Sequence, residues 1–409
     1  MSQRSRLLAM MILCAAPGLA DDWRQWGGPS RDFRIASAKV ADSWPESGPR
    51  RLWERELGEG YSAIVSKDGL LFTMYRTGDQ EHIVCLSAES GETRWTHTYD
   101  APPLPKSELG FGKGPNATPL IEGDRLVAVG FTGKMHCLNA RDGKVLWQTD
   151  LFADHGATFL QFGYSSSPLL VGDCVLIPLG AKDRALAAFS LADGKIRWSA
   201  GDFENSYSTP ILIDVAGKPQ ITLVTTTAIV GLSAEGGETL WSHPYKNQWD
   251  THCTTPVDCG DGRIFYPSFE GGVMLRVNPD GRKVEELWTT KKIGVGQTNV
   301  IYSDGVLFGA SGGGKSGFYA ALKASDGSQL WRERLPIANT LLAGNRLIVL
   351  DESGTLHLLK PSTEKFDEVG RVSIVDGKCW TVPTPVDGRL YLRDQRRISA
   401  IDVSPAGGK

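Results

Sequence analysis

The sequence predicts an all-β fold, an eight-bladed β-propeller of four-stranded antiparallel blades that is closed into a ring by the N-terminal strand. Three observations predict it. An eleven-residue unit recurs along the chain, a short motif opens each blade, and the strands at the two chain ends complete each other. Self-similarity at a fixed period is typical of stacked repeat architectures. A seven-bladed ring is the alternative, because the last two copies are degenerate.

The recurring unit begins with a small residue, has a glycine six positions later and ends in a tryptophan four positions after that glycine, as from Cys137 to Trp147. A tight glycine turn between two short apolar runs predicts a β-hairpin. A lone hairpin cannot bury its apolar faces, so the copies must pack on one another, and tryptophan is large enough to bridge two sheets. We therefore expect one set of residues to dock each blade on the next. These are the tryptophans Trp53, Trp95, Trp147, Trp198, Trp241, Trp288 and Trp331 and the glycines Gly91, Gly143, Gly194, Gly237 and Gly327.

The opening motif is a serine or threonine followed by proline or an aliphatic residue and further apolar residues. Clear copies start at Thr118, Ser167, Thr209 and Thr384. The eighth unit has strands at 389–392 and 398–403 but lacks a fourth strand, whereas residues 51–57 look like a fourth strand without its blade. Pairing 51–57 with 398–403 would remove two open sheet edges, which are an aggregation hazard. The two ends of the chain therefore predict ring closure.

The chain divides into a signal peptide at 1–20, an irregular lead segment at 21–50, the propeller at 51–404 and a tail at 405–409. Residues 1–20 carry two arginines, a short apolar core and small residues before a cleavage point near Ala20–Asp21, which predicts export to the periplasm or secretion. The lead segment contains three tryptophans, which we expect to lie over the body and fill gaps. A net charge of −3 offers nothing that would attract nucleic acid. No transmembrane segment is expected in the mature chain.

The repeats resemble the PQQ-like, quinoprotein-type propeller repeat, in which an Ala-x-Asp-x-x-x-Gly-x-x-x-Trp motif docks each blade on the next. The resemblance covers about residues 51–403 and is carried by the copies that end in tryptophan. It implies the propeller fold and leaves three kinds of function to weigh. The family includes the quinoprotein alcohol dehydrogenases, the BamB propeller of the outer-membrane β-barrel assembly machinery, and many secreted propellers without an assigned role. The lead residues from Trp23 to Arg31 look like those of the last group.

Binding is expected at the end of the ring where consecutive blades are joined, because the connections 96–116, 149–165 and 242–254 are long and rich in aromatic residues. Loops at one end of a rigid scaffold usually carry binding residues. The first residues of the innermost strands should line the channel mouth at this end. They are Tyr61, Asn116, Tyr164, Tyr207, His252, Gln297, Asn339 and Trp380. The alternative is that these residues only plug the channel through packing and mutual hydrogen bonds.

No cofactor and no metal site are predicted. PQQ with Ca²⁺ would be implied only if the chain were a quinoprotein oxidoreductase, and the dehydrogenases of the family hold the quinone with two adjacent cysteines and a Ca²⁺ ion bound by Glu, Asn and Asp. The sequence has no adjacent cysteines, and the eight mouth residues include no carboxylate, whereas Ca²⁺ takes six or more oxygen ligands. No cysteine spacing matches a zinc site. Whether Cys253 and Cys259 form a disulfide stays open.

Residues Gly309 to Ser316 match the P-loop pattern letter for letter. A phosphate-binding loop must lead directly into a helix, whose first amide groups face the anion. Residues Phe318 to Leu322 instead align with the third strand of the other blades. The pattern therefore predicts a hairpin loop.

These observations together predict an exported, non-enzymatic and monomeric propeller that serves as a binding or scaffold protein. It would recognise protein partners in the cell envelope, or a ligand, through the long-loop face and the channel mouth. A BamB-like outer-membrane protein assembly factor is the first alternative, and a PQQ-dependent quinoprotein oxidoreductase is the second.

Overall fold

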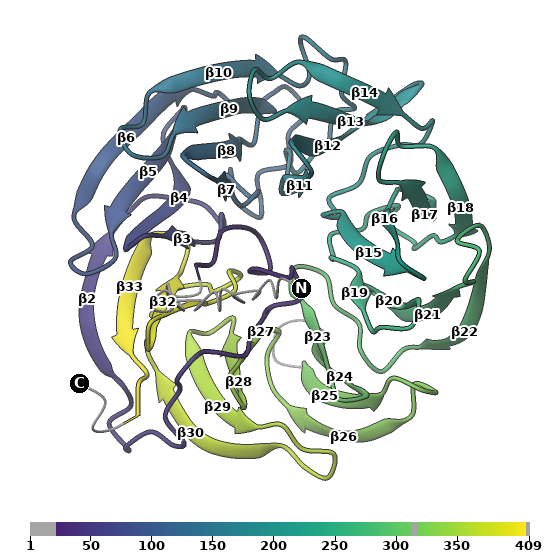
Figure 1. Cartoon of the computed structure of the whole chain (residues 1–409). Helices are drawn as coiled ribbons and strands as arrows, with labels where there is room; N and C mark the ends of the chain where they lie inside the picture. Colours follow the sequence, from purple (N-terminus) through teal and green to yellow (C-terminus); the bar gives the residue numbers. More distant parts are fainter. Residues whose placement is uncertain (1–21, 313–316, 406–409) are drawn as a thin grey trace, which may run out of the picture.

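The chain folds into a ring of eight sheets around a central channel, as Figure 1 shows. The computed structural model describes residues 22–312 and 317–405, and every regular element in this part of the chain is a β-strand. The eight-bladed prediction is therefore confirmed. The expected signal peptide at 1–20 and all but the first residue of the expected tail lie outside the described residues.

Blades 1 to 4 each contain four consecutive strands that pair antiparallel in chain order. Blade 1 consists of β3 (Val65–Lys67), β4 (Leu70–Thr77), β5 (Gln80–Ser87) and β6 (Thr93–Asp100). Blade 2 consists of β7 (Leu120–Glu122), β8 (Arg125–Val129), β9 (Lys134–Asn139) and β10 (Val145–Asp150). Blade 3 consists of β11 (Leu169–Val171), β12 (Cys174–Ala181), β13 (Arg184–Ser190) and β14 (Ile196–Ala200). Blade 4 consists of β15 (Ile211–Val215), β16 (Lys218–Val224), β17 (Ala228–Ser233) and β18 (Thr239–Pro244).

Blades 5 to 8 follow the same order, and two of them take an additional strand from the N-terminal part of the chain. Blade 5 consists of β19 (Val257–Asp258), β20 (Arg263–Ser268), β21 (Gly271–Val277) and β22 (Val284–Thr290). Blade 6 consists of β23 (Val300–Ser303), β24 (Val306–Ser311), β25 (Phe318–Lys323) and β26 (Gln329–Arg334). Blade 7 consists of β27 (Ala338–Ala343), β28 (Arg346–Asp351), β29 (Thr355–Lys360), β30 (Asp367–Ser373) and the short β1 (Arg34–Ile35). Blade 8 consists of β31 (Thr384–Val386), β32 (Arg389–Arg393), β33 (Arg397–Asp402) and β2 (Arg50–Glu56).

The ring closes where β2 joins β33. The two strands are antiparallel, with Trp53 opposite Ala400 and Arg55 opposite Ile398. Strand β2 thus takes the outer, fourth place in blade 8, next to the last strand of the chain (Figure 1). This confirms the closure that the orphan strand predicted. Because the two ends of the chain share one sheet, opening the ring requires breaking a complete strand pair.

Most of the repeated tryptophans reach from the outer strand of one blade to the next blade. Their indole N–H groups donate to backbone carbonyls: Trp53 to Ala88 at 3.1 Å, Trp95 to Ala140 at 3.0 Å, Trp147 to Leu191 at 3.1 Å, Trp288 to Ala324 at 3.2 Å and Trp331 to Ser362 at 2.8 Å. The glycine of the following repeat unit packs against the indole ring of Trp53, Trp95, Trp147 and Trp288. At Gly143, which has a φ of +72°, a Cβ would lie 2.7 Å from the Cε3 atom of Trp95.

Trp241 differs from these tryptophans in the partner of its indole N–H. Its indole N–H donates to the side-chain oxygen of Gln220 in its own blade at 2.8 Å, and the Gln220 amide donates to the carbonyl of Gly281 in blade 5 at 2.9 Å. The indole of Trp241 can turn toward the middle of its own blade because residue 231 is a glycine, where a Cβ would lie 1.9 Å from the indole. The indole N–H of Trp241 therefore reaches blade 5 only through Gln220, while its ring belongs to a core cluster that includes Ile264 and Tyr266 of blade 5.

The hydroxyl of the opening motif also joins neighbouring blades. The backbone N–H of Ala63 donates to Thr118 at 3.1 Å, that of Thr118 donates to Ser167 at 3.0 Å, and that of Ser167 donates to Thr209 at 3.1 Å. The innermost strands would otherwise leave these N–H groups buried without partners, which costs about 1–3 kcal/mol each. The serine or threonine that begins the motif therefore satisfies the inner edge of the preceding blade.

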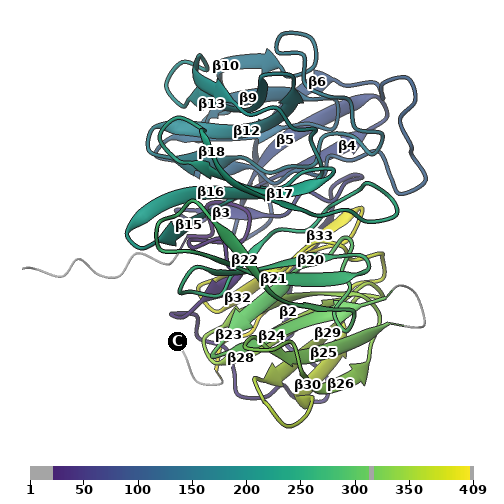
Figure 2. The same ribbon diagram turned by 90° about the vertical axis from the view of Figure 1, so that its right-hand side faces the viewer.

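The lead segment crosses the end of the ring that lies opposite the long connections. The N–H of Trp23 donates to the hydroxyl of Ser66 at 2.9 Å, and the Trp26 indole donates to Thr255 on the far side of the channel at 2.8 Å. The segment then forms β1, which pairs parallel with β27. Strand β1 is the one regular element that the sequence analysis did not expect in this segment. Figure 1 shows this purple chain passing over the centre of the ring, and Figure 2 shows the blades from the side.

An aromatic pocket at the channel mouth

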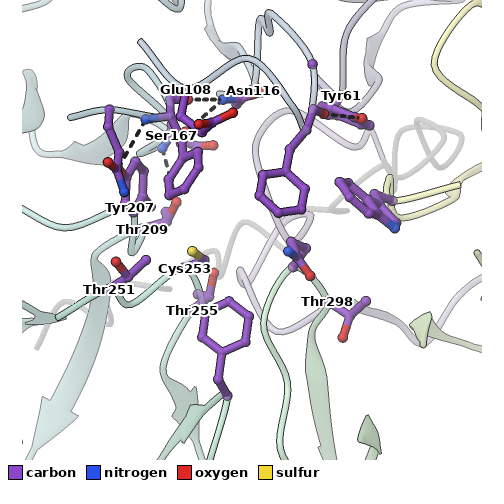
Figure 3. A pocket seen from close by; sticks show the side chains of 18 of the residues that line it. Tyr61, Glu108, Asn116, Ser167, Tyr207, Thr209, Thr251, Cys253, Thr255 and Thr298 are labelled. Atoms are coloured by element: carbon purple, nitrogen blue, oxygen red, sulfur yellow. Dashed lines mark hydrogen bonds between the residues drawn. The ribbon is translucent and has the colours of Figure 1, made fainter. Parts of the chain in front are cut away.

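A pocket of about 550 Å³ occupies the long-loop end of the channel. Five of the eight residues expected at the mouth line it, namely Tyr61, Asn116, Tyr207, Gln297 and Trp380. Figure 3 shows the pocket from close by, with Glu108, Asn116 and Tyr207 on one side and Tyr61 on the other. The structure therefore brings together residues that lie more than 300 positions apart in the sequence.

The other three expected mouth residues are buried and do not line the pocket. Tyr164 is fully buried, and its hydroxyl donates to the carbonyl of Pro178 at 3.0 Å. His252 is 1% exposed, and its ring stacks on that of Tyr245 with centroids 5.0 Å apart. Asn339 lies inside β27 and is fully buried. Tyr164 and His252 lie in connections, each five residues before the innermost strand begins, where no strand alternation decides which way a side chain points. Asn339 is the second residue of β27, where an error of one residue turns a lining position into a core position.

Five aromatic rings form a continuous arc around one part of the pocket, and we call them the aromatic arc. Its members are Trp380, Tyr61, Phe111, Phe162 and Tyr207. Tyr61 stacks on Trp380 with centroids 5.2 Å apart and an interplanar angle of 27°. Phe111 lies 6.2 Å from Trp380 and 5.6 Å from Phe162, and Phe162 lies 5.6 Å from Tyr207. The rings come from four different blade connections and from the segment before β3, so the arc exists only in the closed ring.

Hydrogen bonds hold the members of the arc in place. The Tyr61 hydroxyl donates to the carbonyl of Phe111 at 2.6 Å, and the N–H of Phe162 donates to the hydroxyl of Tyr207 at 3.2 Å. Asn116 donates through its side chain to the carbonyl of Phe162 at 3.0 Å. Burial raises the pKa of Tyr61 and raises the pKa of Tyr207 to about 12, so both hydroxyls stay neutral. The arc is thus a preformed surface, which lowers the entropy lost when a ligand binds.

A buried ion pair supports the connection that carries Phe111. Arg76 and Glu81 are 1% and 0% exposed, and their side chains meet at 2.9 Å. The same guanidinium donates to the carbonyl of Ala101 at 2.6 Å and to that of Lys113 at 2.9 Å, near the two ends of the connection. Glu81 also accepts from the N–H of Phe131 at 3.0 Å, and burial raises the pKa of its carboxyl group. The ion pair therefore holds the connection between β6 and β7, which carries Phe111 to the pocket.

Several polar residues of the lining were not predicted from the sequence, including Glu108, Gln161, Cys253 and Thr298. Glu108 and Gln161 lie inside long connections, and the N–H of Glu108 donates to the carbonyl of Gln161 at 2.6 Å. The Thr298 hydroxyl is buried and has no partner among the described residues. Burial raises the pKa of the Cys253 thiol to about 12. No strand pattern marks such loop positions, so only the lengths of the connections pointed to this region.

The lining does not fit a calcium-bound quinone. Glu108 is the one carboxylate that lines the pocket, and residues 22–312 and 317–405 contain no group of three or more His, Cys, Asp and Glu side chains that could hold a metal ion. Ca²⁺ needs six to eight oxygen ligands, several of them from carboxylates. The six cysteines of the described chain are free thiols, so Cys253 and Cys259 are not bridged. The sequence that resembles a P-loop is followed by strand β25, and its residues 313–316 lie outside the described part.

Comparison with known proteins places the repeats in a family. A protein-family model described as "Outer membrane protein assembly factor BamB" matches residues 79–333, which is more than half of the chain. The chain belongs to this family. The BamB of Legionella pneumophila (strain Paris) is 29% identical over 224 residues, which make up 51% of this chain and 54% of that protein. The matched part thus spans about half the length of this curated relative.

Solved structures share the fold of this BamB-family chain. The crystal structure of BamB from Moraxella catarrhalis superposes with a TM-score of 0.62 at 16% identity and covers 87% of this chain and 99% of that one. The quinohemoprotein alcohol dehydrogenase from Comamonas testosteroni has a TM-score of 0.67 at 13% identity and covers 95% of this chain and 81% of that one. At such identities the likeness shows the fold alone, and a fold does not carry a function. No helix in the described part of the chain is long and apolar enough to cross a membrane.

Proposed function

We propose that the chain is a BamB-like binding protein of the cell envelope, exported by its N-terminal signal, which takes part in outer-membrane protein assembly by holding protein partners at its long-loop face. Membership of the BamB family supports this role over that of an unspecified scaffold. The Legionella relative carries the name of an outer-membrane protein assembly factor. The role needs no chemistry at the site, only a rigid surface and a partner.

The observation that carries the proposal is the exposure of large apolar side chains on this face. Trp249 is 64% exposed, Phe111 is 52% exposed and Phe159 is 37% exposed, and all three lie in connections between blades. Aromatic residues are enriched in the energetically important parts of protein interfaces. Trp249 is also held in a defined loop, because its N–H donates to the side chain of Asn247 at 3.0 Å. The face is therefore apolar, aromatic and ordered before a partner arrives.

Site-specific photo-crosslinking in a Gram-negative host tests the proposal. A photoreactive residue replaces Trp249 in one variant and Phe159 in another, and the matched control carries it at Val145. Val145 is 42% exposed but lies on the outer strand β10. We expect crosslinks from positions 249 and 159, but not from 145, to an identified component of the outer-membrane protein assembly machinery. Equal labelling from all three positions, or labelling of unrelated proteins only, would refute the assignment.

The quinoprotein alternative has its own test. Because the pocket offers one carboxylate where Ca²⁺ needs several, we expect no dye-linked alcohol oxidation when PQQ and Ca²⁺ are added to the purified chain. Absorbance spectroscopy after gel filtration should show no retained quinone. A bound chromophore with alcohol-dependent dye reduction would replace the binding proposal by an enzymatic one.

A further inference from the structure

We propose that the pocket at the channel mouth binds a short, neutral glycan. This ligand goes beyond the proposed role in outer-membrane protein assembly and does not depend on it. The inference rests on the shape of the aromatic arc, on the kinds of polar groups beside it and on the charge of the lining.

The aromatic arc offers flat apolar surfaces that suit sugar rings. A pyranose ring has an apolar face of C–H groups and carries its hydroxyl groups mostly around the edge. Phe111 is 52% exposed and Trp249 is 64% exposed, and both line the pocket. The cavity of about 550 Å³ lies within the range of small-molecule sites, which runs from about 300 to about 1,000 Å³. That volume accepts a short oligosaccharide.

The polar groups of the lining are mostly uncharged and can both donate and accept hydrogen bonds. Asn116, Gln161 and Gln297 contribute side-chain amides, and Thr298 contributes a hydroxyl. Sugar hydroxyls have the same double capacity, so the Gln161 and Gln297 amides can each bond two of them. The Asn116 amide already donates to Phe162 and Ser165, so its oxygen is left as an acceptor. Thr298 is 6% exposed, and its hydroxyl is buried without a partner within the described chain, so a ligand would reach this hydroxyl only if the wall of the pocket shifted.

The charge of the lining disfavours anionic ligands. Glu108 is the one charged side chain that lines the pocket, and no lysine, arginine or histidine lines it. Phosphorylated, sulfated or acidic sugars would meet a carboxylate without a compensating cation, whereas a carboxylate readily accepts bonds from hydroxyls of a neutral sugar. The structure therefore points to neutral glycans and away from nucleotides and acidic polysaccharides.

An extended peptide is the main competing occupant, and the strand edges beside the pocket do not favour it. Peptides are commonly captured by adding a strand to an open sheet edge, through main-chain hydrogen bonds. On the inner edges of blades 1 to 3, the N–H groups of Ala63, Thr118 and Ser167 already donate to hydroxyls of the next blade. These edges cannot offer the same donors to a peptide without opening the joints between blades.

The test is a titration of the purified mature chain with neutral disaccharides and trisaccharides. Binding is monitored by tryptophan fluorescence and calorimetry. Parallel titrations use uronic-acid and sulfated oligosaccharides and a panel of tetrapeptides. We expect saturable binding of at least one neutral glycan in the millimolar range or tighter, and weaker binding of its acidic counterparts. Phe111→Ala and Trp249→Ala should each weaken binding by about tenfold, which corresponds to about 1.4 kcal/mol.

Phe159→Ala is the matched control, because Phe159 is an exposed aromatic residue of the same face that does not line the pocket. The Phe159→Ala variant should bind glycans with unchanged affinity. Glu108→Gln removes the negative charge of the lining and should reduce the difference in affinity between neutral and acidic sugars. Circular dichroism checks that the variants are folded. The inference falls if no neutral glycan binds, if tetrapeptides bind and glycans do not, or if Phe111→Ala and Trp249→Ala leave glycan binding intact. Crosslinking to assembly components would be unaffected by that failure, so the two proposals are separable.

Discussion

Replacing Gly143 by alanine tests whether the contact between glycine and tryptophan fastens one blade to the next. Gly143 has a φ of +72°, and a Cβ there would lie 2.7 Å from the Cε3 atom and 2.8 Å from the Cδ2 atom of Trp95. Both the backbone conformation and the indole therefore oppose a side chain. Gly123, in the same blade, separates the two effects, because its φ is +56° and a Cβ there would meet nothing within 4 Å.

The expected difference in unfolding free energy follows from the costs that the two variants share and from those that only Gly143→Ala incurs. A residue other than glycine in the left-handed region costs about 1–2 kcal/mol, and both variants pay this. Gly143→Ala must also displace the indole, and overpacking typically costs a further ~1–3 kcal/mol. The displaced indole would weaken its 3.0 Å hydrogen bond to Ala140, which contributes about 1 kcal/mol. We therefore expect Gly143→Ala to lower the free energy of unfolding by about 2–4 kcal/mol more than Gly123→Ala does.

Urea unfolding at 25 °C, followed by tryptophan fluorescence and circular dichroism together, measures this difference. The two probes must give the same transition, because an opened blade joint could unfold in a separate step. If Gly143→Ala and Gly123→Ala lower stability by the same amount to within about 0.5 kcal/mol, the indole contact contributes nothing and the role given to the repeat is wrong.

Three further predictions concern buried ionisable groups. Glu81→Gln leaves the guanidinium of Arg76 buried without its partner and should cost about 3–5 kcal/mol in urea unfolding, whereas replacing both residues by methionine should cost less; equal losses would contradict the ion-pair argument. Burial lowers the pKa of His136 to about 3, so between its ordinary value near 6.5 and about 3 the unfolded chain binds a proton that the folded chain does not. The stability that His136 contributes is therefore present above pH 6.5 and is lost as the pH falls, by about 2 kcal/mol at pH 5, and His136→Gln should flatten the measured pH dependence between 7 and 5. The six free cysteines of the described chain should react with a thiol reagent at most slowly in the native protein, with all six reacting in denaturant; fewer than six would reveal a disulfide.

The fold could be predicted from the sequence because its fasteners are local. Each docking unit brings a glycine with positive φ and a tryptophan within eleven residues, so one copy is recognisable without knowledge of the rest. Ring closure was predictable for a related reason, since β2 repeats the outer-strand pattern at the wrong end of the chain. The lead strand β1 was not predictable, because two residues carry no periodicity and its partner β27 lies about 300 positions away.

The pocket could be predicted in its position but not in its full composition. Five of the eight residues predicted near the starts of innermost strands line the pocket, and Tyr61 and Trp380 are among them. Glu108 and Phe111 reach the pocket only because the buried Arg76 draws the connection after β6 across the mouth. These hydrogen bonds join a strand side chain to two backbone carbonyls of the connection. A sequence does not indicate which backbone carbonyls a side chain will reach.

The joint between blades 4 and 5 shows how the lead segment and the repeat depend on each other. At this joint the repeated fasteners are altered, since Trp241 turns inward and Gln220 bonds to Gly281 in its place. The opening hydroxyl of blade 5 belongs to Thr255, and it accepts a hydrogen bond from the indole of Trp26 in the lead segment. The opening hydroxyls of blades 2 to 4 accept instead from the neighbouring blade, so at blade 5 a residue outside the repeats supplies the donor. The same indole also lines the pocket, so one residue of the lead segment takes part in both the altered joint and the pocket. The lead segment is therefore part of the ring's construction and of the pocket, and its tryptophans do more than cover the surface.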